Sequence, residues 1–203
     1  MDPFVHLTPA DARRVPWRNG RGVTEEVAIG PAGATFEAGD FAWRVARAGV
    51  VEDGPFSAFP GFDRVLVVTD GAGLRLVHGG APAVTLAPRV AHPFRGDEPT
   101  SAALVAGPVR DLNVLARRGV CVAEVEVVAD ARVTEVAFAP GAALVHAGGG
   151  AIVVAGAGGH VRLAAGDSLC AAALRAATTV RVSVADGACA IVVRVAWTGA
   201  TTR

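Results

Sequence analysis

The sequence predicts an all-β protein built from two tandem β-barrels, and three observations support that fold class. Short apolar and β-branched runs, mostly of valine, are separated by Gly, Pro and Asp at intervals of about 8–12 residues, which is typical of β-sandwiches and β-barrels. Apolar residues rarely recur with the period of a helix. The segment VLVVTDGAGLRL (65–76) resembles AIVVAGAGGHVRL (151–163), and their offset of about 85 residues indicates a duplicated barrel.

Each predicted strand is an apolar or alternating run that ends at a turn rich in Gly, Pro or Asp. In the first half these runs are 24–29, 41–48, 63–69, 73–77, 83–86, 101–105 and 112–116. In the second half they are 120–128, 131–138, 143–146, 151–155, 160–163, 167–174, 178–183 and 188–197. One short helix is predicted at Thr8–Arg14, because Thr8 suits the N-cap and Pro9 the first helical position.

The boundary between the two predicted barrels falls near Arg117–Val120. Residues 1–118 contain the clusters of Trp, Phe, Asn, Arg and Asp, whereas residues 119–203 are mostly Ala, Val and Gly. We therefore expect a ligand pocket in the N-terminal barrel and a scaffold role for the C-terminal barrel.

Composition excludes several classes of protein. The 19 basic residues balance 19 acidic ones, so no net field draws the chain onto nucleic acid or an anionic membrane. The longest uncharged run, Val136–Gly159, contains a proline and several glycines, which suit strands and turns better than a membrane helix. The three cysteines lack metal-binding spacing and are expected to be buried in a reducing compartment. No signal peptide is evident, so a soluble cytoplasmic protein is expected.

Phosphate-loop and metal motifs are also absent from the sequence. A Walker-type loop needs a lysine, and the chain has none. The glycines of VPWRNGRGVTEE (15–26) lead into a predicted strand and not into a helix, so they do not form a helix-dipole phosphate site. The five histidines are isolated in the sequence, and no cofactor or bound metal is expected: His6, His78, His92, His146 and His160.

The candidate binding residues lie in four stretches of the first half. GPFSAFPGFDR (54–64) forms a rigid aromatic loop that ends in Asp63 and Arg64, and its phenylalanines suit either a pocket wall or core packing alone. In FAWRV (41–45), strand alternation places Trp43 and Arg44 on opposite faces, so Arg44 lies either in solvent or inside the barrel, where it needs an anionic partner. The chain has two asparagines, Asn19 in the Trp17 segment and Asn113 in the Arg110 segment, and Asn113 is expected either to make a structural hydrogen bond or to contact a ligand.

Several motifs in order resemble the HutD/Ves family. These are PWRNGRGVTEEVAIGP, FAWRVARAGVVEDGPFSAFPGFDR, PFRGDEP and GPVRDLNVLARRG; the resemblance is strong over residues 7–119 and follows only the pattern of the second half. It implies a bicupin, with two tandem cupin-like β-barrels in one chain, and no metal. It further implies binding of a small anionic intermediate of histidine utilisation, such as N-formylglutamate or urocanate. The chain departs from the family pattern at Arg21, where Gly is common, and at Leu112, where Phe is usual.

Together these features predict a protein that binds a small carboxylate without catalysing a reaction. An arginine would hold the carboxylate in a bidentate pair, asparagines would orient it, and aromatic rings would wall the site. The predicted ligand-binding residues are Trp17, Asn19, Trp43, Arg44, Phe56, Phe59, Asp63, Arg64, Arg110 and Asn113.

Two alternatives remain open at this point. The first is a metal-independent isomerase or hydrolase acting on a similar carboxylate. Its acid or base would come from Glu25, Glu26, Asp63, Asp97 or His92. The second is a structural or regulatory partner protein, and an exposed sheet edge would suit a homodimer.

Overall fold

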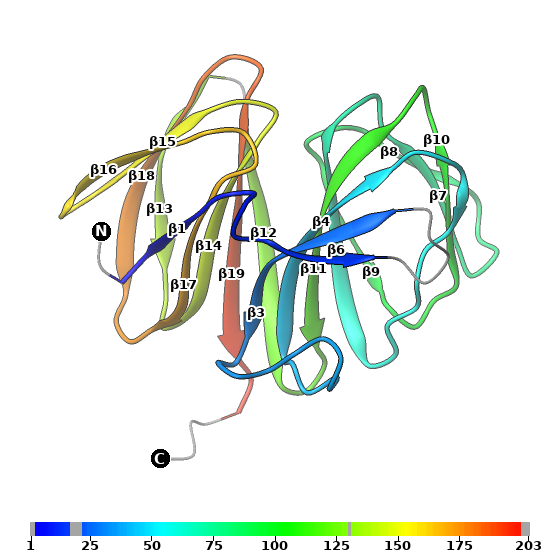
Figure 1. The fold of residues 1–203 in the computed structure, drawn as a ribbon, viewed down its shortest axis with the longest axis horizontal. Coiled ribbons are helices and arrows are strands. Elements are labelled where there is room, and N and C mark those ends of the chain that lie inside the picture. Colours follow the sequence, from blue (N-terminus) through cyan, green and yellow to red (C-terminus); the bar gives the residue numbers. More distant parts are fainter. Residues whose placement is uncertain (1–2, 17–21, 130, 200–203) are drawn as a thin grey trace.

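The computed structural model describes residues 3–16, 22–129 and 131–199 and consists of strands, turns and loops. It confirms the all-β fold class. Two halves stand side by side (Figure 1), and each contains a larger and a smaller antiparallel sheet, the arrangement expected of a bicupin. Within the described residues, no helix is long and apolar enough to cross a membrane.

The first half contains a six-stranded and a four-stranded sheet. The larger sheet has the order β2 (Arg13–Pro16), β3 (Val23–Gly30), β4 (Trp43–Val50), β11 (Val109–Arg117), β6 (Phe62–Asp70) and β9 (Ala91–Arg95). The smaller sheet has the order β5 (Gly54–Pro55), β10 (Thr100–Leu104), β7 (Leu74–His78) and β8 (Val84–Leu86).

The second half contains a five-stranded and a four-stranded sheet. The larger sheet has the order β1 (Val5–Leu7), β17 (Ser168–Leu174), β14 (Gly141–Gly148), β19 (Cys189–Trp197) and β12 (Cys121–Ala129). The smaller sheet has the order β13 (Val133–Phe138), β18 (Thr178–Val184), β15 (Ile152–Gly156) and β16 (Gly159–Leu163). Strand β1 begins the chain yet pairs with β17, so the first strand lies in a sheet of the second half (Figure 1).

The two halves repeat one topology. The order β4-β11-β6-β9 matches β12-β19-β14-β17, and β5-β10-β7-β8 matches β13-β18-β15-β16. The duplication is therefore real, but the sequence comparison that indicated it is shifted by one strand. Residues 65–76 cover β6 and β7, which correspond to β14 and β15, whereas residues 151–163 cover β15 and β16. Glycine-rich turns follow both β14 and β15, so similar residues occur at two successive hairpins.

Every predicted strand overlaps an observed one, while β1, β2, β5 and β9 were missed because they are short or interrupted by proline. The predicted helix at Thr8–Arg14 is wrong. Thr8 does act as a local cap, since its backbone nitrogen and its hydroxyl both donate to Asp11 Oδ2 at 2.8 and 2.7 Å. These bonds close a single turn, after which the chain enters β2 at Arg13 and pairs with β3.

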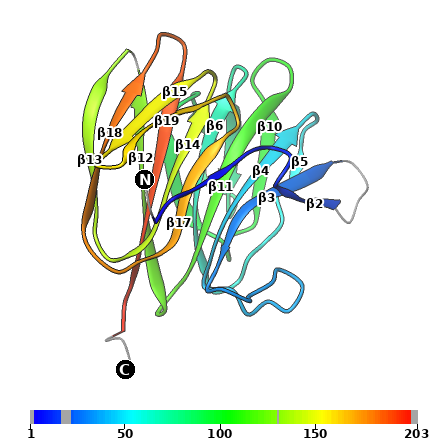
Figure 2. The same cartoon turned by 60° about the vertical axis from the view of Figure 1, so that its left-hand side comes forward.

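The large sheets of the two halves pack face to face through an apolar layer (Figure 2). This inter-half core includes Trp43 and Leu112 from the first half and Leu144 and Ile191 from the second. Trp43 is 1% exposed, and a Cβ at Gly30 would lie 2.4 Å from its ring, so glycine at that position leaves room for the indole. The three cysteines are buried and free, as predicted.

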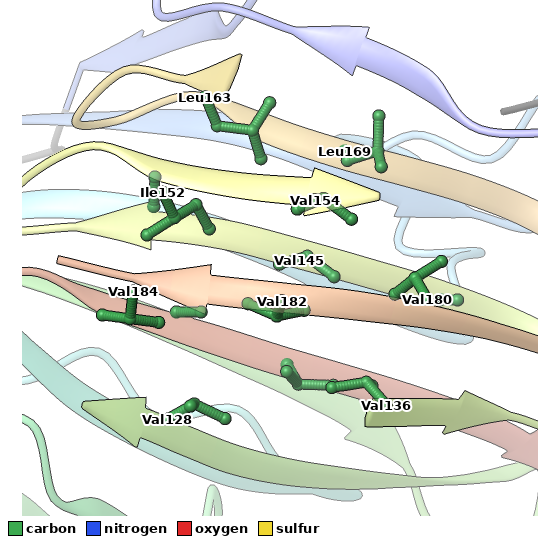
Figure 3. Close-up of a cluster of buried hydrophobic side chains, with 14 of the residues drawn as sticks. Val128, Val136, Val145, Ile152, Val154, Leu163, Leu169, Val180, Val182 and Val184 are labelled. Carbon is green, nitrogen blue, oxygen red and sulfur yellow. The ribbon is translucent and has the colours of Figure 1, made fainter. Parts of the chain in front are cut away.

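The interior of the second half is filled with hydrophobic side chains (Figure 3). Val145, Val154, Val182 and Leu169 point toward one another from facing strands. This dense apolar interior is the reference against which the first half can be compared.

Candidate functional site

Arg64 lies inside the first half, on the inner face of β6, and is 5% exposed. Its Nη1 donates to the carbonyl oxygen of Ser57 at 2.9 Å, and its Nη2 donates to Asn113 Oδ1 at 2.7 Å. Its Nε has no hydrogen-bond partner among the residues the structure describes. Burial lowers the pKa of Arg64 to about 10, and the charge of Asp111 only partly offsets that effect.

Aromatic rings surround this guanidinium. The Cζ atom of Arg64 lies 5.7, 5.1 and 4.8 Å from the ring centroids of Phe56, Phe59 and Phe94. Phe56 and Phe59 belong to the rigid loop around β5, and Phe94 lies opposite Arg64 on β9. The face of an aromatic ring attracts a cation but does not neutralise it, so the site keeps its positive charge.

The charge of Asp111 acts on Arg64, but the two side chains are linked through Asn113 and not by a direct hydrogen bond. Asn113 Nδ2 donates to Asp111 Oδ1 at 2.7 Å, so the amide stands between the carboxyl group and the guanidinium. Burial raises the pKa of Asp111 to about 7, although the charge of Arg64 and the hydrogen bond from Asn113 act in the opposite direction. A carboxyl group that is half protonated near neutrality compensates Arg64 incompletely.

In the second half, the positions that correspond to Arg64, Asp111 and Asn113 contain only apolar side chains. Asn113 pairs with Leu66 on β6, and at the corresponding place Val192 pairs with Val145 on β14. By the same register, Asp111 corresponds to Ala190 and Arg64 to Ala143. Three polar side chains in one barrel thus replace Val192, Ala190 and Ala143 in the other. Because buried charge costs stability, a packing role does not account for them.

Arg44 forms a second buried cationic site in the same barrel. Its Nε donates to Glu26 Oε2 at 2.7 Å, and both side chains are less than a tenth exposed. Its Cζ lies 4.3 Å from the ring centroid of Phe36. Arg44 therefore has its own carboxylate, in contrast to Arg64.

Two histidines meet at the rim of the Arg64 site. His78 Nε2 and His92 Nε2 are 2.9 Å apart, and His78 Nδ1 is 3.0 Å from Thr100 Oγ1. The His78 ring also packs against Phe94, with 4.7 Å between ring centroids. Partial burial lowers the pKa of both histidines. Both histidines are partly exposed.

The raised pKa of Asp111 predicts a pH dependence of stability. Between pH of about 4 and 7 the folded chain binds a proton that the unfolded chain lacks. The contribution of Asp111 to the free energy of unfolding should therefore fall as pH rises, by up to about 1.4 kcal/mol per pH unit. Asp111→Asn should remove this slope while keeping a similar shape. Urea unfolding of both proteins at pH 5, 6 and 7 measures it.

The comparison with Asp111→Asn is needed because His78, His92 and His146 act in the opposite direction. Their lowered pKa values make the folded chain bind fewer protons than the unfolded chain, which raises stability as pH approaches 6.5. All three histidines remain in the variant, so the difference between the two proteins isolates Asp111. Parallel pH curves would contradict the prediction.

The structure brings some predicted site residues together and separates others. Phe56, Phe59, Arg64 and Asn113 form one group, and Arg44 lies in the same barrel with Glu26. Trp43 belongs to the inter-half core and not to the barrel interior. Trp17 and Asn19 lie outside the described residues, as does Arg21.

Two predicted ligand-binding residues, Asp63 and Arg110, lie outside the group around Arg64. Asp63 is exposed, and Arg118 Nη1 donates to it at 3.2 Å on the outside of the barrel. Arg110 is exposed and lines a separate cavity between the halves. Leu112 belongs to the inter-half core, so its side chain faces away from Asn113 and Asp111. Strand alternation explains both separations, because neighbouring residues point to opposite faces of the sheet.

Sequence reasoning did not place Asp111, His78 or Phe94 in the site. It named Glu26 and His92 only as acid or base candidates of the alternative enzyme, and not as the partners of Arg44 and His78. His78 and His92 are 14 residues apart on β7 and β9, so only the folding of the two sheets onto each other brings them together. Two-residue alternation from Asn113 would have placed Asp111 on the same inner face. Among the described residues, no three His, Cys, Asp or Glu side chains cluster closely enough to hold a metal ion.

Fold and site define a class of all-β protein with two barrel-like halves, in which the first encloses a buried arginine and the second is apolar. The chain belongs to the HutD family, whose model matches residues 9–191.

Relatives support that assignment. The chain is 34% identical over 137 residues to Protein Ves from Cronobacter sakazakii. The matched region covers 66% of this chain and 70% of that protein. It is 37% identical over 119 residues to an uncharacterized 21.2 kDa protein in the hutC 3' region of Pseudomonas putida, which covers 57% of this chain. The chain spans only 59% of the length of that second relative.

The fold also resembles a solved structure of HutD from Pseudomonas fluorescens SBW25, described as a formate condition. The two structures superpose with a TM-score of 0.81 at 30% identity, covering 97% of this chain and all of the other.

Proposed function

We propose that this chain binds a small carboxylate metabolite inside its first barrel, with Arg64 as the residue that holds it. The observation that carries the proposal is a buried guanidinium whose nearest compensating acid bonds to Asn113 and not to Arg64 itself. A carboxylate ligand would supply the missing charge through short charge-assisted hydrogen bonds.

The surroundings of Arg64 suit such a ligand. Asn113 already accepts a bond from Arg64 and donates one to Asp111, so its amide is fixed in orientation. Phe56, Phe59 and Phe94 provide apolar walls for the carbon skeleton. Because the arginine supplies the positive charge, binding needs no metal ion.

The ligand class follows from this chemistry together with the family. A HutD structure is described as a formate condition, and one relative lies in a hutC 3' region. We therefore include N-formylglutamate- and urocanate-like carboxylates in the proposal, with a cytoplasmic role in modulating histidine utilisation.

Isothermal titration calorimetry with a chelator present tests the proposal. The ligands are formate, N-formyl-L-glutamate and urocanate, and the matched neutral controls are formamide and urocanate methyl ester. Saturable heat with at least one acid, and none with its neutral partner, is expected. Absence of heat with all three acids would remove the proposal.

A specific observation also supports a second candidate function, a metal-independent enzyme acting on a similar carboxylate. Asp111 has a pKa raised to about 7, and a group poised near neutrality can move protons in either direction. The acids named from the sequence are less suited to this role, since Glu25 and Glu26 are bonded to arginines. Turnover of a bound carboxylate that Asp111→Asn abolishes, while binding persists, would support the enzyme.

A further inference from the structure

A cavity of about 290 Å³ lies between the two halves, outside the Arg64 site. We call it the inter-half cleft. Its base contains the buried residues Thr69, His146 and Gly148, and the exposed residues Asp70 and Arg110 stand at its mouth. It is lined by both sheets of the inter-half packing, so neither half forms it alone.

Two glycines in the lining of the cleft pack closely against neighbouring side chains. A Cβ at Gly166, which has a φ of 90°, would lie 2.6 Å from Arg47 Nη1, the atom that donates to the Gly166 carbonyl oxygen. A Cβ at Gly148 would lie 2.8 Å from Cys189 Sγ and 3.3 Å from Thr69. Side chains at these positions would displace Arg47 and Cys189, so glycine preserves the packing that shapes the cleft.

The cleft contains side chains of both charges, and only some of them form ion pairs with one another. Arg47 Nη2 donates to Glu25 Oε2 at 2.7 Å, so these two residues compensate each other. Arg110 and Asp70 lie directly opposite on β11 and β6, yet neither joins an ion pair within the described part of the chain. Asp70 accepts a long 3.3 Å hydrogen bond from Thr69. A cation and an anion thus lie on neighbouring strands without a direct ion pair between them.

Three further polar residues of the cleft are His146, Asp111 and Arg14. Burial lowers the pKa of His146 to about 3, so its ring stays neutral, and its Nδ1 lies 2.9 Å from Ser168 Oγ. Asp111 lines the cleft as well as contacting Asn113, and it is the residue that the cleft and the Arg64 site share. Arg14 lies 3.9 Å from Glu25, at the edge of the paired group.

We propose that the inter-half cleft binds a small zwitterion of the α-amino acid class, with its carboxylate against Arg110 and its ammonium group against Asp70. The cleft has the volume of about ten water molecules at roughly 30 Å³ each, which suits a small amino acid. A ligand of opposite charges satisfies both residues at once, whereas a simple anion would leave Asp70 uncompensated and would be repelled by it. The charged contacts of this site, Arg110 and Asp70, differ from Arg64 of the proposed carboxylate site, although Asp111 lies beside both.

Two-dimensional ¹H–¹⁵N NMR of the full chain tests the proposal. Glycine, L-serine, L-glutamine, L-glutamate and L-histidine are titrated separately, and the N-acetyl derivative of each serves as the control that lacks the ammonium group. At least one amino acid should shift the backbone amide signals of Gly148, Gly149 and Gly166 saturably, and its N-acetyl derivative should not.

Variants locate the binding. Arg110→Gln and Asp70→Asn each remove one charge at an exposed position, so the fold should persist, and each should weaken the affinity about tenfold or more. Arg75→Gln, which removes an exposed arginine outside the cleft, is the matched control and should leave amino acid binding unchanged. The proposal is overturned if no amino acid shifts those amides, if the N-acetyl derivative binds equally well, or if both charge variants bind like the parent chain.

Discussion

Replacing Arg64 with glutamine should weaken carboxylate binding by about a hundredfold, because it removes the charge-assisted hydrogen bonds that we assign to this side chain. Glutamine keeps a polar amide but has neither the charge nor the fork of donors that a carboxylate accepts. Calorimetric titration with whichever acid binds the parent chain measures the loss. The matched control is Arg75→Gln, an exposed arginine of the same half, which should bind like the parent chain.

The stability of the Arg64→Gln protein should change little. The substitution loses the bonds to Ser57 and Asn113 but also removes a buried charge that no carboxylate contacts directly. Circular dichroism on heating would establish that the variant is folded. Unchanged affinity in Arg64→Gln, or an equal loss in Arg75→Gln, would show that Arg64 does not hold the ligand.

Replacing Trp43 with alanine should lower the free energy of unfolding by about 3–5 kcal/mol, the usual cost of truncating a large buried aromatic side chain. Trp43 is 1% exposed and packs in the inter-half core, where its loss leaves a cavity between the two large sheets. Urea unfolding followed by circular dichroism gives the value.

Trp197→Ala is the matched control for this measurement, since Trp197 is 43% exposed at the end of β19. It should cost less than about 1 kcal/mol, as surface substitutions usually do. Equal effects of the two substitutions would mean that the packing of the halves adds little to stability. A single cooperative transition in the parent chain would show that the halves unfold together.

The strands were readable from the sequence because most of them are local patterns. Val-rich runs bounded by Gly, Pro and Asp gave every long strand, including β12 and β19 of the second half. The same method failed at Thr8–Arg14, where residues suited to a helix start also suit a single turn. It failed again at β9, whose proline argues locally against a strand although β6 pairs with it.

The candidate site was readable only in part, because a site is a set of contacts between distant segments. The aromatic loop and Arg64 were recognised from their composition, and they do lie together. The assignment of Trp43 and Arg110 to the same pocket ignored the face of the strand on which each lies. The acid that matters most to Arg64, Asp111, was not considered.

By itself, the sequence determined that this protein is an all-β duplication with its polar chemistry in the first half. Those properties depend on local alternation, turn residues and composition, which can be read without coordinates. Only the tertiary structure decided that Arg64 is buried behind Asn113 and Asp111 while the matching place in the second half is apolar. It also decided that the halves enclose a cleft with Arg110 and Asp70 at its mouth. Strand order and sheet packing determine these contacts, because they bring together residues that are far apart in the sequence.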